Sequence, residues 1–239
     1  MIPVAVLIPA RNEAECLPDL LDRLSAAEVE HTIVVDNGST DSTAEIAAGR
    51  GATVVHVAEP GYGRACLAGI RELLSWEDRP EVLVFVDADD FLAPAQLEEL
   101  VRPLLAGRAD QVVGERRSGP GVPGVRVHAR LGNAFITTLL RRVYGSRVRD
   151  MGPFRAIRIS CLQGLDLDDP DYGWFVQMQV RALRAGCRVR GFPVAFRART
   201  AGASKVSGSM SGSVRAGVKI LKTLAYEMLR SPGRAHHPS

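Results

Sequence analysis

Four short apolar runs, each followed by a stretch with helical spacing, fill residues 1–106 and strongly limit the folds open to this chain. The runs are rich in β-branched residues and occupy positions 4–10, 31–37, 53–58 and 82–88. The helices predicted to follow them occupy positions 13–27, 42–50, 64–75 and 95–106. Such alternation is typical of parallel strands joined by right-handed crossovers, so we predict an α/β fold with a mostly parallel sheet.

The remainder of the chain is less regular but predicts further elements of both kinds. Strands are expected at 106–117, 151–160 and 187–200, and helices at 127–144, 171–186 and 214–229. A chain of 239 residues with 46% hydrophobic residues can bury one substantial core. We therefore expect a single domain over 1–230, followed by a disordered tail at 231–239.

Charge divides this domain into two halves. Residues 1–115 hold 8 arginines, no lysine and 21 acids, a net charge of −13, whereas residues 116–239 hold 22 basic and 6 acidic residues, a net charge of +16. The asymmetry favours an acidic half that binds a metal and a basic half that handles anions; the alternative is two charged surfaces without a ligand. Aromatic residues make up only 5%, which argues against the base stacking used in nucleic-acid binding.

The cysteines and the apolar runs predict where the protein resides. The four cysteines, at positions 16, 66, 161 and 187, form no C-x-x-C pair and are expected to be reduced core thiols of a cytoplasmic protein. The first residues carry no basic leader or cleavage site and predict a buried strand. No stretch reaches the roughly 20 apolar residues that a membrane span needs. Membrane contact, at the inner face of a membrane, would therefore be peripheral.

The carboxyl ends of the predicted parallel strands are where ligands of such sheets bind. Asp87 and Asp89 directly follow the run VLVFV, and two carboxylates there can share a hard divalent cation with the oxygens of a substrate diphosphate. The alternative is an acidic cap for the helix that begins near Pro94. Asp36 ends the second run, where its carboxylate can accept hydrogen bonds from a nucleoside or cap the next helix.

The first half contains four ordered motifs, VLIPARNEAECLPDLL, IVVDNGSTDST, PGYGRACLAGI and VFVDADD. Together they resemble the family 2 inverting glycosyltransferases with the GT-A fold, a group that includes dolichyl- and polyprenyl-phosphate mannose and glucose synthases. Later segments resemble a bacterial branch of that group: DMGPFRAIR, YGWFVQMQVRALRAG and FRARTAGASKVSGSMSGSVRAGVKIL. The resemblance covers residues 2 to about 225 and implies a nucleotide-sugar-binding half at 1–115 and an acceptor half at 116–230.

The resemblance implies roles for single residues in the first half. Three residues would lie against the nucleoside: Pro9, Arg11 and Glu13. Asp36 would contact the base, and the Gly63-Arg64 pair would lie near the diphosphate. Asp87, Ala88 and Asp89 would contact the donor sugar nucleotide, with Mg²⁺ or Mn²⁺ held on the two carboxylates and Asp89 counted as catalytic.

In the second half, the resemblance places Arg155 near the acceptor. A further segment matches the loop that closes over the phosphates, and its binding residues are Arg199, Ser204 and Lys205. We expect that loop to become ordered over the phosphates when nucleotide and metal bind.

The chain departs from the family pattern at two positions. Phe91 stands where a metal-assisting Gln is frequent, and Gln177 stands where we expect an acid; an amide cannot act as a general base. A phosphate acceptor is already anionic and needs no base. Residues 119–165 hold eight arginines and one acid, Asp150, which points to such an acceptor. Gln177 would then position the substrate; Asp150, and after it Asp171, would be the base for a neutral acceptor.

Three functions follow from these residues. The first is transfer of a hexose from a nucleoside-diphosphate sugar to a polyprenyl phosphate. The second keeps the donor but uses a soluble small-molecule acceptor. The third is a nucleotide-sugar-binding protein with weakened catalysis, suggested by Gln177 and Phe91.

The last predicted helix carries an apolar stripe: Val214, Val218, Leu221, Ala225 and Met228. We expect the stripe to pack against the domain or against a second subunit in a homodimer. Rest on an anionic membrane surface is the alternative.

Overall fold

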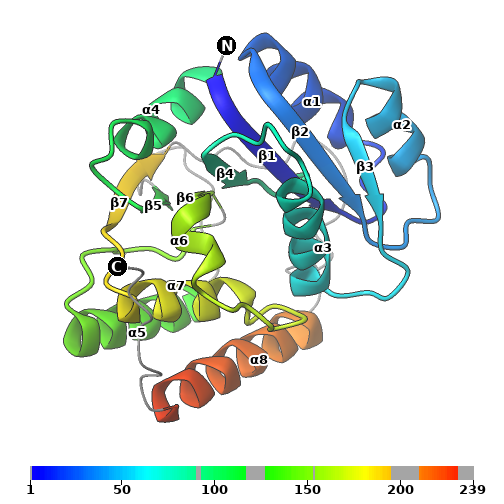
Figure 1. The fold of residues 1–239 in the computed structure, drawn as a ribbon. Helices are drawn as coiled ribbons and strands as arrows, with labels where there is room; N and C mark the ends of the chain where they lie inside the picture. Colours follow the sequence, from blue (N-terminus) through cyan, green and yellow to red (C-terminus); the bar gives the residue numbers. More distant parts are fainter. Residues whose placement is uncertain (1, 90–92, 117–126, 153, 195–209, 231–239) are drawn as a thin grey trace.

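The computed structural model describes residues 2–89, 93–116, 127–152, 154–194 and 210–230. Seven strands form one sheet in the order β3-β2-β1-β4-β6-β5-β7 (Figure 1). The strands are β1 (Ile2–Ala10), β2 (Val29–Asp36), β3 (Thr53–His56), β4 (Val82–Phe85), β5 (Gln111–Arg116), β6 (Arg155–Arg158) and β7 (Val189–Val194). The helices are α1 (Leu17–Ala26), α2 (Thr43–Gly49), α3 (Tyr62–Leu74), α4 (Pro94–Leu105), α5 (Val127–Tyr144), α6 (Ile159–Gln163), α7 (Trp174–Arg184) and α8 (Met210–Leu229).

The predicted α/β fold class is confirmed, and the sheet is mostly parallel. The first four strands, β1 to β4, pair in parallel, as do β5 and β7. β6 is antiparallel to both of its neighbours, with Phe85 of β4 and Val113 of β5 opposite Arg155. This register brings Arg155 to the carboxyl end of β4.

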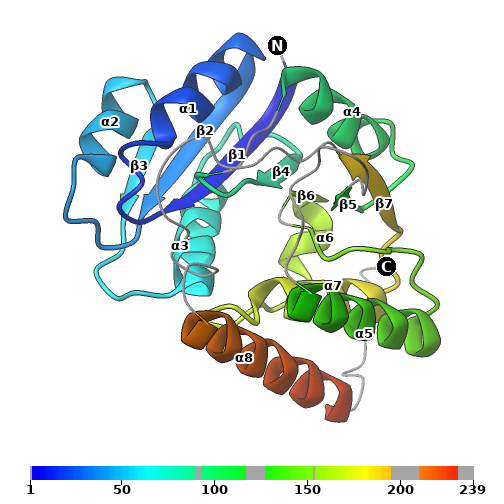
Figure 2. The ribbon, with the colours of Figure 1, turned by 180° about the vertical axis from the view of Figure 1, so that it is seen from behind.

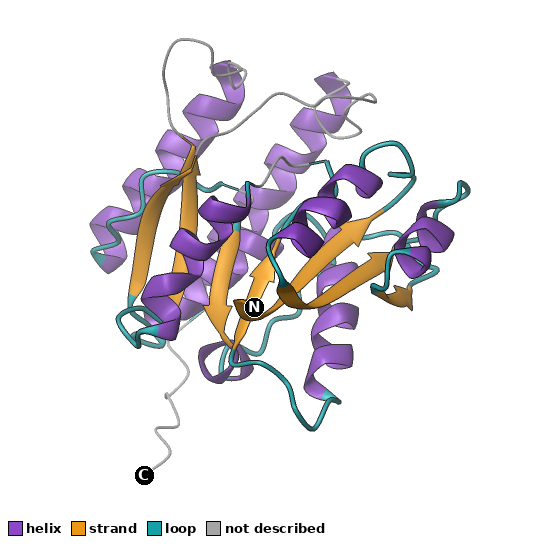
Figure 3. Ribbon diagram, turned by 90° about the horizontal axis from the view of Figure 1, so that it is seen from above, coloured by secondary structure: helices purple, strands orange, loops and turns teal. Residues whose placement is uncertain are grey.

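Both faces of the sheet are covered by helices (Figure 3). One face packs against α1, α2 and α4, and the other against α3, α6 and α7. In β4, Val82 and Val84 point to the first face, and Leu83 and Phe85 point to the second. All four side chains are fully buried, because a central strand of a doubly covered sheet has no solvent side.

A second, smaller core joins α5, α7 and α8 in a helical layer beside the sheet (Figure 2). Its buried members are Ile136, Leu140, Val176, Val180 and Leu224. In the views of Figures 1 and 2, α8 is the outermost of these helices. Within the described residues, no helix combines the length and the apolar content that crossing a bilayer requires.

Two local predictions are corrected by the structure. The predicted strand at 151–160 ends at Arg158, and Ile159–Gln163 forms the short helix α6. The first helix begins at Leu17, not near residue 13, because Asn12 has a left-handed φ of 52° that turns the chain after β1. The predicted tail at 231–239 lies outside the described residues.

The prediction of four reduced thiols is wrong for two cysteines. Cys161 of α6 and Cys187, which precedes β7, form a disulfide with their Cα atoms 6.8 Å apart. Cys66, which is buried, and Cys16, which is partly exposed, are not part of a disulfide. Spacing along the chain could not reveal the pair, because it is made by contact between separate elements. The disulfide also removes the support that reduced cysteines gave to a cytoplasmic location.

The final helix packs through a different face from the one predicted. Ile220 and Leu224 join the small core, while Val218 and Leu221 are each 46% exposed. Met228 is the only described member of the predicted stripe that packs inward. The stripe was expected to be the packing face, and most of its described part faces solvent instead.

Candidate active site

The turns after β1 and β2 are joined by hydrogen bonds at the carboxyl end of the sheet. Asn12 Oδ1 accepts from the backbone N–H of Thr40 at 2.7 Å, and the N–H of Asn12 donates to Ser39 Oγ at 2.9 Å. The N–H of Glu13 donates to Thr43 Oγ1 at 2.9 Å. These bonds fix the segment after β1, which is predicted to contact the nucleoside, against the turn that follows β2.

The other predicted nucleoside residues lie around this turn. Pro9 is partly buried near the end of β1, and Arg11 is exposed. Asp36 is buried, and its carboxylate already has partners: Oδ1 accepts from the N–H of Ser39 at 3.0 Å, and Oδ2 lies 3.3 Å from His56 Nδ1. The sequence left this carboxylate without a structural role, and the structure gives it one; its contact with a base stays a prediction.

Asn37 shapes the same edge and was not singled out from the sequence. Its Nδ2 donates to the carbonyl oxygens of Val57 at 3.3 Å and Glu59 at 2.8 Å, and its Oδ1 accepts from the N–H of Gly61 at 2.8 Å. The side chain is buried. A polar residue directly after a buried strand was the available signal, but the Asn-Gly pair was interpreted only as a turn. Asn37 therefore fixes the chain that leads into α3.

Asp87 lies just beyond β4 and is partly buried. Its Oδ1 accepts a hydrogen bond of 2.7 Å from Tyr62 Oη at the start of α3. Ala88 is buried beside it, and Asp89 is partly buried. The structure thus brings the two predicted metal ligands to the carboxyl end of the central strand.

Burial raises the pKa of Asp87 to about 6, although the Tyr62 hydrogen bond lowers it. The negative charges of Asp89 and Glu13 raise this pKa further, and the positive charge of Arg155 lowers it. The ionised form of Asp87 is therefore less favourable than that of an exposed aspartate, and added positive charge would stabilise it. A hard divalent cation would supply that charge, and carboxylate oxygens suit Mg²⁺ or Mn²⁺.

Among the described side chains, no group of three His, Cys, Asp or Glu is arranged to hold a metal ion. Asp87 and Asp89 are the carboxylates predicted to bind the cation, and oxygens of the donor diphosphate could complete its coordination. Metal binding at these two residues stays a prediction.

Arg155 is a fully buried cation close to this carboxylate. Its Nη1 lies 3.3 Å from Gln179 Oε1 and 3.4 Å from the carbonyl oxygen of Phe175, and its guanidinium carbon lies 4.3 Å from the centre of the Phe175 ring. Its Nε has no hydrogen-bond partner in the described part of the chain. Burial lowers the pKa of Arg155 to about 10. Its hydrogen-bond partners are neutral, and the negative charges of Asp150 and Asp87 act on it without forming an ion pair among the described side chains.

Gln179 is a residue that the sequence interpretation missed. It lies one turn after Phe175 on α7, and its buried amide nitrogen has no hydrogen-bond partner among the described atoms. A carboxylate at this position would neutralise Arg155. The neutral amide leaves the guanidinium charged and without an ion-pair partner on α7.

The glycines predicted to lie near the diphosphate also contact the second half of the chain. A Cβ added to Gly63 would come within 1.9 Å of the carbonyl oxygen of Asp169, and one added to Gly61 within 2.4 Å of that of Pro170. The N–H of Arg64 donates to the same Pro170 oxygen at 3.1 Å. The loop between α6 and α7 therefore packs on the N-terminus of α3.

Gln177 holds that loop in place. Its Oε1 accepts from the N–H groups of Asp168 and Asp169, each at 2.9 Å. Its Nε2 donates to Asp168 Oδ1 at 2.8 Å and to Glu227 Oε1 at 3.1 Å. The side chain is 3% exposed, and its amide is fully used inside the protein. These contacts position the loop on α3, and the predicted positioning of the substrate by Gln177 stays a prediction.

Asp150 is tied to the end of β5. Arg116 donates to it from Nε at 2.8 Å, from Nη2 at 2.7 Å and from its backbone N–H at 2.9 Å. Both carboxylate oxygens of this buried side chain are occupied. A base must have an oxygen free to take a proton, so this geometry disfavours the role of fallback base.

Four predicted positions lie outside the described residues: Phe91, Arg199, Ser204 and Lys205. The predicted closure of the loop over the phosphates therefore stays a prediction.

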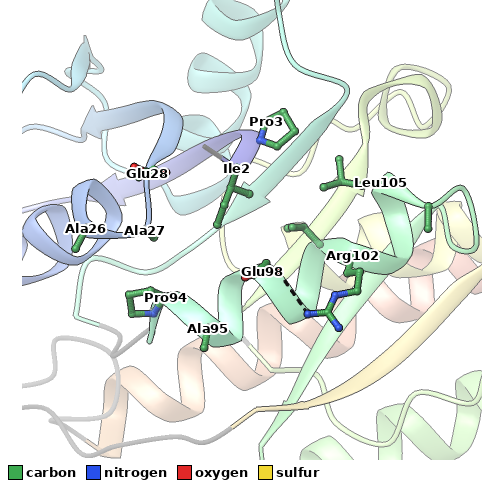
Figure 4. A pocket seen from close by; sticks show the side chains of 12 residues that line it. Ile2, Pro3, Ala26, Ala27, Glu28, Pro94, Ala95, Glu98, Arg102 and Leu105 are labelled. Carbon is green, nitrogen blue, oxygen red and sulfur yellow. Dashed lines mark ion pairs between the residues drawn. The ribbon is translucent and has the colours of Figure 1, made fainter.

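A groove of about 720 Å³ lies far from these residues, where β1 begins (Figure 4). It is formed by α1, α4 and the start of β1. Glu98 and Arg102, one turn apart on α4, form an ion pair of 3.5 Å in its wall. It contains none of the predicted site residues and lies at the amino end of the sheet. Ligands of parallel sheets bind at the opposite end.

Comparison with known proteins agrees with the motifs. The model of the glycosyl transferase family 2 matches residues 5–165. An uncharacterised glycosyltransferase of Mycobacterium tuberculosis is 37% identical over 222 residues, covering 93% of this chain and 98% of that protein. An undecaprenyl-phosphate mannosyltransferase of Micrococcus luteus is 36% identical, with 87% and 89% covered. A polyprenol monophosphomannose synthase of Mycolicibacterium smegmatis is 34% identical, with 85% and 81% covered.

Solved structures support the fold. Glucosyl-3-phosphoglycerate synthase from Mycobacterium tuberculosis, in complex with Mn²⁺, UDP and phosphoglyceric acid, superposes with a TM-score of 0.75. It covers 95% of this chain and 79% of its own, at 23% sequence identity. The family match and the relatives together identify the chain as a member of glycosyl transferase family 2, with the GT-A fold.

Proposed function

We propose that the protein is a metal-dependent, inverting hexosyltransferase that transfers a sugar from a nucleoside diphosphate to a polyprenyl phosphate. The observation that carries the proposal is the contrast between the buried Arg155, which has no ion-pair partner among the described side chains, and the bound carboxylates of the acceptor half. Two relatives support it, an undecaprenyl-phosphate mannosyltransferase at 36% identity and a polyprenol monophosphomannose synthase at 34% identity.

On the donor side, Asp87 and Asp89 would hold the divalent cation against the diphosphate. The cation would neutralise the charge that develops on the leaving diphosphate, which is the usual role of such metals in group transfer. An oxygen of the acceptor phosphate would form the new bond to the anomeric carbon as the bond to the diphosphate oxygen breaks. A single displacement of this kind inverts the configuration at that carbon.

On the acceptor side, the carboxylates are engaged within the protein. The second half holds six acids, Asp150, Asp166, Asp168, Asp169, Asp171 and Glu227. Five of them accept hydrogen bonds or ion pairs inside the protein, and Asp166 is exposed in the loop after α6. A hydroxyl acceptor would need a carboxylate to take its proton, whereas an anionic phosphate would not.

A solved structure with the same fold supports the second candidate function, transfer to a soluble acceptor, since that synthase binds phosphoglyceric acid. That molecule is also a phosphorylated anion, so a basic acceptor site suits both candidates. The two candidates differ in the rest of the acceptor, because a polyprenyl phosphate carries a long hydrophobic chain and phosphoglyceric acid carries none.

The test is transfer of labelled hexose from UDP- and GDP-sugars in detergent micelles with Mn²⁺. Polyprenyl phosphate is compared with the matched polyprenol, which lacks the phosphate, and with 3-phosphoglycerate. We expect label to enter the organic phase only with polyprenyl phosphate. Transfer to 3-phosphoglycerate alone would establish the soluble-acceptor enzyme, and transfer to polyprenol would show that a base is present. Donor binding without any transfer would favour the catalytically weakened binding protein.

A further inference from the structure

The outer face of α8 is an exposed apolar stripe. Val218 and Leu221 are each 46% exposed, and Leu229 is 86% exposed at the end of the helix. Ala225 is exposed between them. These positions recur every three or four residues, so they line one side of the helix. Single exposed apolar residues are common on proteins, but an aligned set on one helix marks an interaction surface.

Only positive charges accompany the stripe on the described part of α8. Lys219, Lys222 and Arg230 flank it, and Lys219 pairs with Asp171 of the loop below. The one acid of the helix, Glu227, is completely buried and faces α7. The exposed surface of α8 thus combines apolar side chains with cations and presents no carboxylate.

The neighbouring helix α5 has the same composition on its outer side. Leu131 is 67% exposed and Phe135 is 56% exposed. Its exposed charged residues in the described part are all arginines: Arg130, Arg141 and Arg142. Both helices pack on α7, and they meet where Tyr144 Oη lies 3.7 Å from Met228 Sδ. The two helices therefore adjoin at the ends that carry Tyr144 and Met228, and each of them exposes apolar and basic side chains.

We propose that the outer face of α8, extended by α5, docks on an anionic lipid surface. Apolar side chains can enter the boundary between headgroups and acyl chains while lysines and arginines contact the lipid phosphates. A second copy of this chain suits the surface less well. A two-fold interface would bring each basic face against itself, with no acid on either α8 to pair with it.

The attachment of α8 to the protein gives this docking a fixed orientation. Thr223 Oγ1 donates to Asp169 Oδ2 at 2.7 Å, and Glu227 pairs with Arg181 at 2.7 Å. Asp169 belongs to the loop that packs on Gly63 of α3. A membrane-bound α8 would thus hold the acceptor half at the lipid surface, where a polyprenyl phosphate resides. The docking itself does not depend on which acceptor the enzyme uses.

The experiment is sedimentation with lipid vesicles, without donor or acceptor. Vesicles of phosphatidylcholine are compared with vesicles that also contain phosphatidylglycerol, at low and high salt. The test variant combines Lys222→Glu with Leu229→Ser, and Lys222→Glu alone is a milder form. The matched control combines Arg102→Glu with Leu105→Ser on α4, the helix that lies at the opposite end of the molecule from α8 (Figure 1); Leu105 is 42% exposed.

We expect the wild type to bind the anionic vesicles and to be released by salt. Removing one positive charge near such a surface weakens binding about five-fold. Replacing lysine by glutamate changes the charge by two units, so this factor applies twice. With the lost leucine, the test variant should bind about 100-fold more weakly. The control should stay within about two-fold of the wild type, and all variants should unfold at similar temperatures.

Three results would overturn the inference. The wild type could fail to bind anionic vesicles at low salt, or the α4 control could lose binding as much as the α8 variant. A wild-type dimer that the α8 variant dissociates, measured by light scattering, would make the stripe an interface between copies. Because sugar transfer is tested in detergent micelles, failure of vesicle docking would leave the proposed transfer reaction untouched.

Discussion

Asp87 and Glu227 are two interior carboxylates that the protein treats in opposite ways. Glu227, on α8, is completely buried and pairs with Arg181 at 2.7 Å and Arg184 at 3.2 Å. Asp87 receives only the neutral hydroxyl of Tyr62 at 2.7 Å, and among the described side chains no cation lies within ion-pair distance of it. The charge of Glu227 is paired with two arginines, whereas Asp87 has no ion pair among the described side chains and only the positive charge of Arg155 acts on it from a longer distance.

The difference separates a structural carboxylate from one kept for a ligand. A buried charge without a partner destabilises the fold unless a partner is supplied from outside. Asp87 stands at the carboxyl end of the central strand, where a ligand can supply that partner. Glu227 has no such need, because α7 already provides two guanidinium groups.

The largest expected effect is on catalysis at Asp87. Asp87→Asn removes a metal ligand, and so does Asp89→Asn. Each should lower transfer about 1,000-fold or more, since metal stabilisation of a leaving diphosphate is worth several kcal/mol. Turnover is measured with Mn²⁺ and with excess chelator, using Asp110→Asn as a control carboxylate paired with Arg188. Near-normal turnover of either variant, or full activity in chelator, would refute the metal assignment.

The next effect is on stability at Glu227. Glu227→Gln leaves Arg181 and Arg184 without their shared carboxylate and should lower the free energy of unfolding by about 3 kcal/mol. Urea denaturation measures this loss. The folded fraction of Glu227→Gln should retain most of the wild-type turnover, because Glu227 connects two helices and does not contact substrate. An unchanged unfolding midpoint would show that the ion pairs of Glu227 do not stabilise the fold.

A smaller effect distinguishes the two carboxylates by pH. The pKa of Asp87 rises from its ordinary 3.8 to about 6 in the folded protein, so the metal-free fold loses stability as the pH rises from about 4 to about 6. Asp87→Asn should abolish this loss and stabilise the metal-free protein by about 1–3 kcal/mol at neutral pH. Unfolding of wild type and variant is compared across that range. Parallel stability curves would show that the Asp87 charge is already compensated.

The smallest effects come from the same substitution at two positions of α7. Gln177→Glu would place a carboxylate against Asp168 and Glu227, and we expect a loss of about 1 kcal/mol in stability without any new base in the pH–rate profile. Gln179→Glu would place one against Arg155, and we expect a gain of similar size.

The rate of sugar transfer is a second measurement for the variants Gln177→Glu and Gln179→Glu. Neutralising Arg155 through Gln179→Glu should lower transfer to an anionic acceptor. If Gln177→Glu instead raises kcat and adds a carboxylate-like ionisation, the acceptor is a hydroxyl and the polyprenyl-phosphate proposal fails.

Much of the donor half was predictable from the sequence. The alternation of β-branched runs and helical spacing predicted β1 to β4 and the helices between them, because a parallel sheet leaves local signals at each crossover. The position of Asp87 and Asp89 after an apolar run placed them at the carboxyl end of a central strand. Local pattern and topology together were sufficient there.

The acceptor half shows where that reasoning stops. Gln177 drew attention as a missing acid, yet the structure sets Gln179 against Arg155 and binds Gln177 to the loop on α3. The cysteine pair and the buried face of α8 were predicted wrongly as well. In each case the deciding partner lies on another element, at a distance along the chain that periodicity cannot report.

The sequence by itself therefore determined the fold class, the order of strands and helices in the donor half and the carboxylates that end the central strand. Only the tertiary structure decided which charges are compensated. Arg155 has no ion pair among the described side chains, and Glu227 is neutralised by two arginines, because antiparallel β6 and the packing of α8 on α7 bring those particular side chains together. The energy of a buried charge depends on its neighbours in space, and those neighbours are set by packing and not by spacing along the chain.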